Sequence, residues 1–124
     1  MHLTGDDLVQ IHDRLISLHG GTRGILDQGT IEYVVTRASG RDSFVEEAAV
    51  LIELIAMMHP FLDGNKRTAF ASAETLLRIN GSELVVGDKE AIEFMLEIAS
   101  GDMTHTQVLA WLEDRLKNLD ESLG

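Results

Sequence analysis

Apolar residues recur at three- and four-residue spacing along most of this chain, the spacing that predicts amphipathic helices. Capping residues and glycines separate the runs. The predicted helices are a first between Thr4 and Gly20-Gly21, a second between Asp27 and Gly40, a third over about 44–58, a fourth over about 65–80, and two more over about 89–100 and 104–118. Their expected inward faces are Leu8, Ile11, Leu15 and Leu18; Ile31, Val34, Val35 and Ala38; Phe70, Ala73, Leu76 and Leu77; Phe94, Met95 and Ile98; and Val108, Trp111, Leu112 and Leu116.

The third predicted helix is apolar on nearly every side, so we expect it to be the central buried helix. Ser43 is its expected N-cap, with Glu46 completing a capping box. The triplet Leu84-Val85-Val86 is compatible with either a short extended piece or a loop. With no repeat, linker or low-complexity tract, the pattern predicts one all-α domain over residues 1–124. It is a helical bundle of about six helices, with residues 120–124 as a frayed tail.

Composition and charge exclude several classes of protein. Ten Lys and Arg residues stand against 21 Asp and Glu residues, a net charge of −11, so the bulk charge opposes binding of nucleic acid. The absence of cysteine excludes disulfides and a thiolate zinc site. The start lacks the features of a signal peptide, and the longest apolar run, 48–58, contains Glu53 and is too short to span a bilayer. We therefore expect a cytoplasmic protein with no direct nucleic-acid or membrane partner.

One segment departs from this ordinary pattern, namely His59-Pro60-Phe61-Leu62-Asp63-Gly64-Asn65-Lys66-Arg67. Pro60 is the chain's only proline, and it ends the third helix so that His59 is presented at a helix end. Phe61 offers an apolar anchor for the loop that follows.

The fourth helix begins within this segment, and its first backbone N–H groups belong to Gly64, Asn65, Lys66 and Arg67. Such unpaired N–H groups and the positive end of the helix dipole form an anion site. Lys66 and Arg67 add two charges where a helix normally prefers acids. A base, a carboxylate, an anion site and two cations within nine residues favour phosphoryl or nucleotidyl transfer.

Each of these residues also has a plain structural interpretation. Taken alone, Asp63 is an N-cap of the fourth helix, and Lys66 and Arg67 are a solvated pair. Their joint occurrence at fixed spacing favours function. The remaining histidines have no such neighbours and are interpreted as surface or structural residues: His2, His12, His19 and His105.

The nine-residue string resembles the signature of the Fic/Doc family, and the lysine at position 66, in place of the second glycine of the Fic pattern, is similar to the Doc branch. The resemblance extends, more weakly, over most of the chain. It implies a Fic/Doc-like helical bundle in which His59 is the general base and Asp63 binds Mg²⁺. The residues it implies for the phosphates of ATP are Gly64, Asn65, Lys66 and Arg67, with Phe61 as loop anchor. By position alone, Gly40 and Arg41 fall in the segment of the flap that aligns a target.

The resemblance further implies a Doc-like toxin that phosphorylates a hydroxyl on a translation factor, as for elongation factor Tu. Fic enzymes that transfer AMP usually carry a second arginine where this chain has Phe70, which favours phosphorylation. Two alternatives stay open: an adenylyl or other nucleotidyl transferase, and a catalytically idle module that binds a protein. The chain carries no match to the inhibitory Ser/Thr-x-x-x-Glu-Gly/Asn pattern of some Fic proteins. A separate, Phd-like antitoxin is therefore the expected partner.

Overall fold

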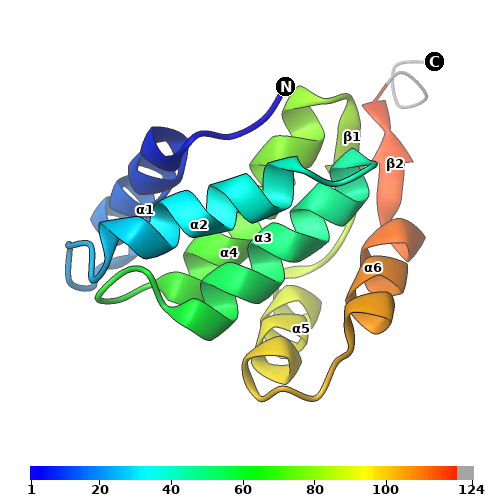
Figure 1. Cartoon of the computed structure of the whole chain (residues 1–124). Helices are drawn as coiled ribbons and strands as arrows, with labels where there is room; N and C mark the ends of the chain where they lie inside the picture. The colour runs from blue at the N-terminus through cyan, green and yellow to red at the C-terminus, as the bar shows by residue number, and fades with distance from the viewer. Residues whose placement is uncertain (120–124) are drawn as a thin grey trace.

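Helix α3 (Phe44–Met58) packs against four other helices and carries much of the core, in a computed structural model that describes residues 1–119 (Figure 1). Leu51, Ile52 and Ile55 of this helix are at most 2% exposed, so its prediction as the central buried helix is confirmed. The other elements are α1 (Gly5–His19), α2 (Gln28–Ser39), α4 (Asn65–Ile79), β1 (Ser82–Leu84), α5 (Asp88–Ala99), α6 (His105–Asp114) and β2 (Leu116–Asn118). The all-α prediction is confirmed for residues 1–119, with one small sheet added; the expected tail lies outside the described residues.

The helix starts follow from local side-chain chemistry. Thr4 and Asp7 form a reciprocal capping box at α1, and the Asp27 carboxylate accepts from the backbone N–H of Gly29 at 2.9 Å. Ser43 accepts from the N–H of Glu46 at 3.2 Å. The Glu46 side chain, however, lies 3.8 Å from the Arg41 guanidinium, so the structure records only one half of the capping box expected there.

The inward face of α1 differs from the prediction. Leu8, His12 and Ile16 are buried, whereas Leu18 is 70% exposed. These three buried residues follow one another at four-residue spacing, which places them on one stripe of the helix. A histidine therefore occupies the position between two buried aliphatic residues.

The C-terminal part ends in a strand instead of a continued helix. The helix predicted over 104–118 stops at Asp114, and Leu116–Asn118 pairs antiparallel with Ser82–Leu84, with Leu84 opposite Leu116. Of the two possibilities left open for 84–86, an extended piece does form, but two residues earlier, over Ser82–Leu84. Arg115 stands at the change of direction, where its guanidinium donates to Glu90 at 3.0 and 3.2 Å and lies 4.0 Å from the centre of the Trp111 ring.

No helix within residues 1–119 combines the length and the apolar character needed to cross a bilayer. Helices α2 and α3 run antiparallel, since a short connection joins them, so the end of α3 lies beside the start of α2 (Figure 1). The connection between α3 and α4 therefore meets the connection between α1 and α2 on one side of the molecule.

Candidate functional site

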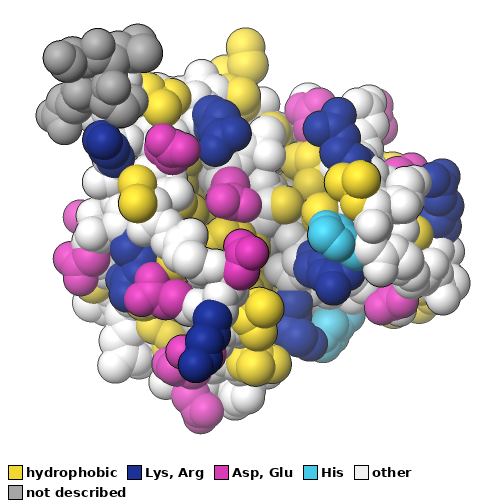
Figure 2. All heavy atoms as spheres, turned by 180° about the vertical axis from the view of Figure 1, so that it is seen from behind, with side chains coloured by type: hydrophobic (Ala, Val, Ile, Leu, Met, Phe, Trp, Pro, Cys, Tyr) yellow, Lys and Arg dark blue, Asp and Glu magenta, His cyan; other side chains and the backbone are white. Residues whose placement is uncertain are grey.

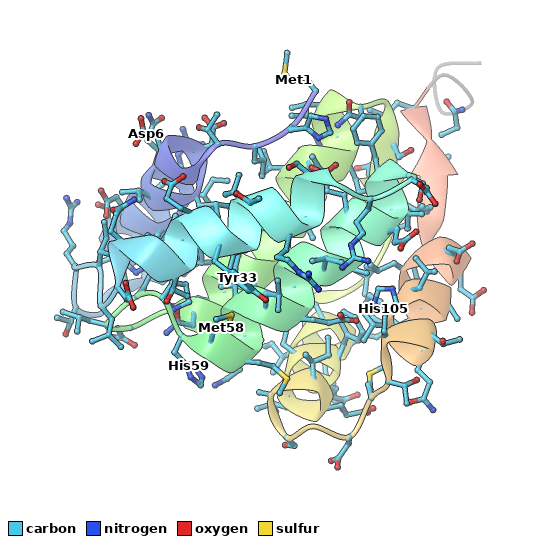
Figure 3. All side chains as sticks on the ribbon, viewed as in Figure 1. Met1, Asp6, Tyr33, Met58, His59 and His105 are labelled. Carbon is cyan, nitrogen blue, oxygen red and sulfur yellow. The ribbon has the colours of Figure 1, made fainter. Side chains whose placement is uncertain are left out.

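His59 follows the last residue of α3 in a left-handed backbone conformation, with φ 50° and ψ 61°. It is the only non-glycine residue among 1–119 with positive φ, a conformation that costs about 1–2 kcal/mol. Its N–H still donates to the carbonyl of Ile55 at 3.2 Å, and Pro60 prevents a further helical turn. The imidazole is exposed, and Figure 3 shows it extending from the end of α3 to the outside of the bundle.

The loop that follows, residues 59–64, is called the motif loop below, and Phe61 lies buried at its middle with 1% exposure. The Phe61 ring stacks on the His12 ring with centroids 4.0 Å apart and planes 5° apart. Asn65 clamps the same residue, because its side-chain oxygen accepts from the Phe61 N–H at 3.1 Å and its amide nitrogen donates to the Phe61 carbonyl at 2.9 Å. Both polar atoms of the Asn65 side chain are thus engaged within the protein, so of its polar groups the backbone N–H, in the first turn of α4, is the one that could meet an anion.

Backbone groups hold the Asp63 side chain from two sides. One carboxylate oxygen accepts from the Gly64 N–H at 2.9 Å and the other from the Thr22 N–H at 3.0 Å. These two hydrogen bonds, foremost the one from Thr22, lower the pKa of Asp63 below its usual value of 3.8, and the nearby His12 and Arg67 lower the pKa further. Asp63 is therefore an oriented carboxylate that stays ionised.

The N-terminus of α4 carries no side-chain cap. Gly64 is the N-cap, with φ 73° and ψ 22°, so the interpretation of Asp63 as the cap of this helix is wrong. The first N–H bonded back along this helix is that of Thr68, to the carbonyl of Gly64 at 3.0 Å. The N–H groups of the first turn, next to the exposed side chains of Lys66 and Arg67, therefore form a place where an anion could bind.

A cavity of about 460 Å³ opens at this helix terminus. Its walls come from the end of α1 and the start of α4; the lining residues are Leu15, Ile16, His19, Gly20, Gly21, Asp63, Gly64, Asn65, Lys66 and Arg67. Figure 2, which turns α1 to the right, shows Lys and Arg side chains beside histidine side chains on that part of the surface. These cations form a local positive patch on a chain whose net charge is −11.

The connection between α1 and α2, residues 20–27, runs along the motif loop. Ile25 forms an antiparallel bridge with Phe61, and the Leu62 N–H donates to the Gly24 carbonyl at 3.1 Å. The Leu26 N–H donates to the carbonyl of Pro60 at 2.8 Å. This connection therefore supports the backbone of the motif loop.

The possible target flap, Gly40 and Arg41, is not brought to the motif loop. These residues precede the N-terminus of α3, whereas His59 follows its C-terminus, and a helix of 15 residues spans about 22 Å. Their assignment to a target flap rested only on their position in the sequence. In the structure, they lie at the end of the antiparallel α2–α3 pair that is remote from His59. Arg41 contributes instead to a separate cavity of about 200 Å³ with Arg37 and His105.

Three contributors to the site were not singled out from the sequence: His12, His19 and the Thr22 N–H. His12 is 1% exposed and its Nε2 lies 2.7 Å from the Asp63 carbonyl oxygen. Its spacing of four residues from Leu8 and Ile16 was the available signal for an inward position. A backbone N–H such as that of Thr22 gives no signal in side-chain chemistry.

The donor set around Asp63 fits Mg²⁺ and no metal that needs a protein cage. Residues 1–119 contain no group of three or more His, Asp or Glu side chains arranged to hold an ion. Mg²⁺ is commonly bound by one or two carboxylates together with phosphates and water. The Asp63 carboxylate accepts one hydrogen bond on each oxygen and so retains lone pairs for an ion.

Comparison with known proteins gives two kinds of match. The profile of the Fic/DOC family matches residues 2–77, more than half of the chain. The chain is similar to the protein named "Protein kinase doc" of Escherichia phage P1, with 32% identity over 113 residues that cover 86% of this chain and 89% of that protein. It is also similar to "Toxin Doc" of Mycolicibacterium smegmatis, with 34% identity over 102 residues, 75% of this chain and 78% of the relative.

Proposed function

The chain belongs to the Fic/Doc family, and we propose that it is a Doc-like toxin of a toxin–antitoxin pair with protein kinase activity. In this proposal it transfers the γ-phosphate of ATP, with Mg²⁺, to a hydroxyl of a translation factor of the elongation factor Tu class, in the cytoplasm. The observation that carries the proposal is the cavity where the ionised Asp63 meets the uncapped, cationic start of α4. Two relatives that match most of this chain are named as a kinase and as a toxin. Their names support the Doc-like kinase over the other activities of the family.

His59 is the proposed general base. It stands exposed at the start of the motif loop, where a hydroxyl on another protein can reach it. The imidazole accepts the proton of that hydroxyl while the hydroxyl oxygen bonds to the γ-phosphorus. The bond from this phosphorus to the oxygen that bridges the β- and γ-phosphates breaks, and ADP leaves.

The phosphates are proposed to lie at the start of α4. Asp63 would hold Mg²⁺, which when bound offsets the negative charge of the phosphate oxygens. The backbone N–H groups of Asn65 and Lys66, and the side chains of Lys66 and Arg67, donate to the remaining oxygens, whereas the Gly64 N–H is engaged by the Asp63 carboxylate. The side chain of Asn65 contributes by holding Phe61, so its part in phosphate binding is confined to its backbone.

Phosphoryl transfer is favoured over nucleotidyl transfer by two positions on α4. Lys66 places a side chain where the Fic pattern has a glycine, and Phe70 stands where AMP-transferring enzymes usually carry a second arginine. The Phe70 ring packs edge-on against Phe94 and Trp111, with centroids 6.4 and 6.5 Å apart. This position therefore supplies an apolar contact to α5 and α6 and no charge for a triphosphate. Nucleotidyl transfer on the same scaffold remains the second candidate.

A toxin of this type requires restraint from a partner. The chain has no match to the inhibitory pattern found in some Fic proteins; the nearest string, from Ser43 to Glu47, is followed by Ala48. We therefore include a small Phd-like antitoxin in the proposal, with a tail that folds against an apolar groove of this domain.

Transfer of label from ATP tests the proposal. Elongation factor Tu is incubated with the purified chain, Mg²⁺ and ATP labelled at either the α- or the γ-phosphate, and its intact mass is measured. We expect γ-label on the target, no α-label, and a mass increase of one phosphate. An increase of one AMP with α-label would replace the kinase by a nucleotidyl transferase. If the chain shows no Mg²⁺-dependent binding of ATP, the remaining explanation is the catalytically idle module that binds a protein.

A further inference from the structure

His12 lies beneath the motif loop, although it belongs to α1 and is 51 residues away from Asp63 in sequence. It is 1% exposed, and its ring stacks face to face on the Phe61 ring. A Cβ atom added to Gly64 would lie 3.8 Å from two atoms of this ring. A single buried side chain thus contacts the motif loop at two of its residues, Phe61 and Asp63, and fills the space next to Gly64.

The hydrogen bond of His12 has a defined direction. Its Nε2 lies 2.7 Å from the carbonyl oxygen of Asp63, and a carbonyl oxygen only accepts, so Nε2 carries the hydrogen and donates. On the other side of the ring, Nδ1 lies 3.5 Å from a carboxylate oxygen of the half-exposed Asp13. The ring is therefore held between a packing partner, an acceptor and a carboxylate, in one orientation.

The Asp63 carbonyl belongs to the peptide group that leads into Gly64, and the Gly64 N–H donates to the Asp63 side chain. Rotation of that peptide would move this N–H and turn the carboxylate away from the N–H of Thr22. Gly64, with φ 73°, has few barriers of its own against such rotation. The hydrogen bond from His12 opposes this rotation at the carbonyl end of the peptide, as the bond from Gly64 to the Asp63 side chain does at the N–H end.

We propose that His12 is a positioning residue that orients Asp63 for Mg²⁺ and so sets the metal requirement for nucleotide binding; the metal part rests on the proposed function. Two components contribute, namely the stack on Phe61 and the N–H donated to Asp63. Loss of supporting hydrogen bonds around metal ligands typically weakens metal binding by about 10- to 100-fold. Because His12 acts on the backbone of Asp63 and not on its carboxylate, we expect a change of about tenfold.

Two variants separate the two components. His12→Phe keeps a ring to stack on Phe61 and removes the donor, whereas His12→Gln removes the ring and keeps an N–H at a similar distance from Cα. Should His12→Phe not fold, His12→Asn replaces it, because its side chain is polar but too short to bring a donor to the Asp63 carbonyl. Leu8→Ala is the matched control, since Leu8 is buried on the same face of α1, four residues before His12.

Two readouts are compared on the full chain. The first is the amide NMR signals of Thr22 and Gly64 without metal, which report their hydrogen bonds to the Asp63 carboxylate. The second is the Mg²⁺ concentration for half-maximal binding of a non-hydrolysable ATP analogue. We expect His12→Phe, or His12→Asn, to shift both amide signals and raise the Mg²⁺ concentration about tenfold. His12→Gln should stay within about threefold of wild type.

The proposal is overturned if the folded donor-less variant keeps both amide signals and stays within about twofold of the wild-type Mg²⁺ requirement. It is equally overturned if Leu8→Ala changes both readouts as much as the donor-less variant, since the effect would then follow stability alone. Failure of the proposed function gives a different result, namely no Mg²⁺-dependent binding by the wild type. In that case the amide signals measured without metal still decide whether His12 orients Asp63. The part of the proposal that concerns Mg²⁺ would then be refuted.

Discussion

Gly21 lies where the α1–α2 connection approaches Asp63, and its replacement by alanine would disturb the carboxylate directly. Its φ of 119° is one that residues with a Cβ rarely adopt. A Cβ atom would lie 2.8 Å from the Asp63 carboxylate oxygen that accepts from Thr22, and 2.9 Å from the end of the Ile16 side chain. The Ile16 side chain can rotate away, but the carboxylate has to leave its hydrogen bond or the loop has to shift.

The size of the effect divides into stability and binding. Forcing a residue other than glycine into such a conformation costs about 1–3 kcal/mol, and the stiffer unfolded chain returns about 0.4–1 kcal/mol. We expect Gly21→Ala to lose about 1–2 kcal/mol, which lowers Tm by about 3–5 °C per kcal/mol for a chain of this size. A displaced Asp63 should also raise the Mg²⁺ concentration needed for nucleotide binding by about tenfold.

Gly81→Ala, outside the cavity lining, is the main matched control, and Gly20→Ala, at a residue that lines the cavity, is the second. Both glycines have positive φ, 92° and 84° respectively, and a Cβ atom at either position would meet nothing within 4 Å. Each control should therefore lose stability through backbone strain while leaving Asp63 in place. Thermal unfolding measures the change in Tm for all three variants. Titration of an ATP analogue at several Mg²⁺ concentrations measures the Mg²⁺ concentration needed for nucleotide binding.

A selective change in Gly21→Ala is the expected result: Tm falls in all three variants, and the Mg²⁺ requirement rises in one. Equal Mg²⁺ requirements in Gly21→Ala and Gly81→Ala would refute the reasoning, because the contact with Asp63 would then have no consequence. A Gly21→Ala variant as stable as wild type would refute the strain estimate.

Two further predictions concern the chemistry of the site. His59→Ala should lower phosphate transfer by about 10²–10⁴-fold in a kinetic assay, and this variant should not arrest growth under the expression conditions in which we expect the wild type to do so; near-wild-type transfer would remove His59 from its role. Because the pKa of Asp63 lies below 3.8, its carboxylate should stay ionised as pH falls toward 4, and its contribution to the folded state should be lost only as pH passes below that value. A carbon NMR titration checks this, and a midpoint above 3.8 would contradict the two backbone hydrogen bonds as its cause.

Most of the helices were predictable because their starts and stops are local. Asp27 caps α2 through a residue two positions away, and Gly20 ends α1 through its own φ. The segment around Leu116 was not predictable in this way. Its spacing from Leu112 continues the helical pattern, but pairing with a strand more than 30 residues earlier outweighs it, and no local residue carries that information.

The chemistry of the site was also local, since His59, Asp63 and the cations of α4 lie within nine residues. What a short string could not give is how each side chain is used. The amide of Asn65 was expected to meet phosphate, yet it clamps the backbone of Phe61. The sequence position of Gly40 also suggested a place near the site. In the fold, Gly40 lies in the connection between the antiparallel helices α2 and α3, at the end remote from the site.

The orientation of Asp63 depends on residues that no motif contains. Its carboxylate is held by the N–H of Thr22 and its carbonyl by His12, and both come from the first 22 residues. The periodicity of α1 could place His12 on the inward face, but its partner depends on how α1 packs against α4. The nine-residue motif therefore contains the proposed reacting groups, whereas contacts from α1 and the connection after it hold Asp63. A search for functional residues confined to exposed or clustered polar side chains would omit the second set.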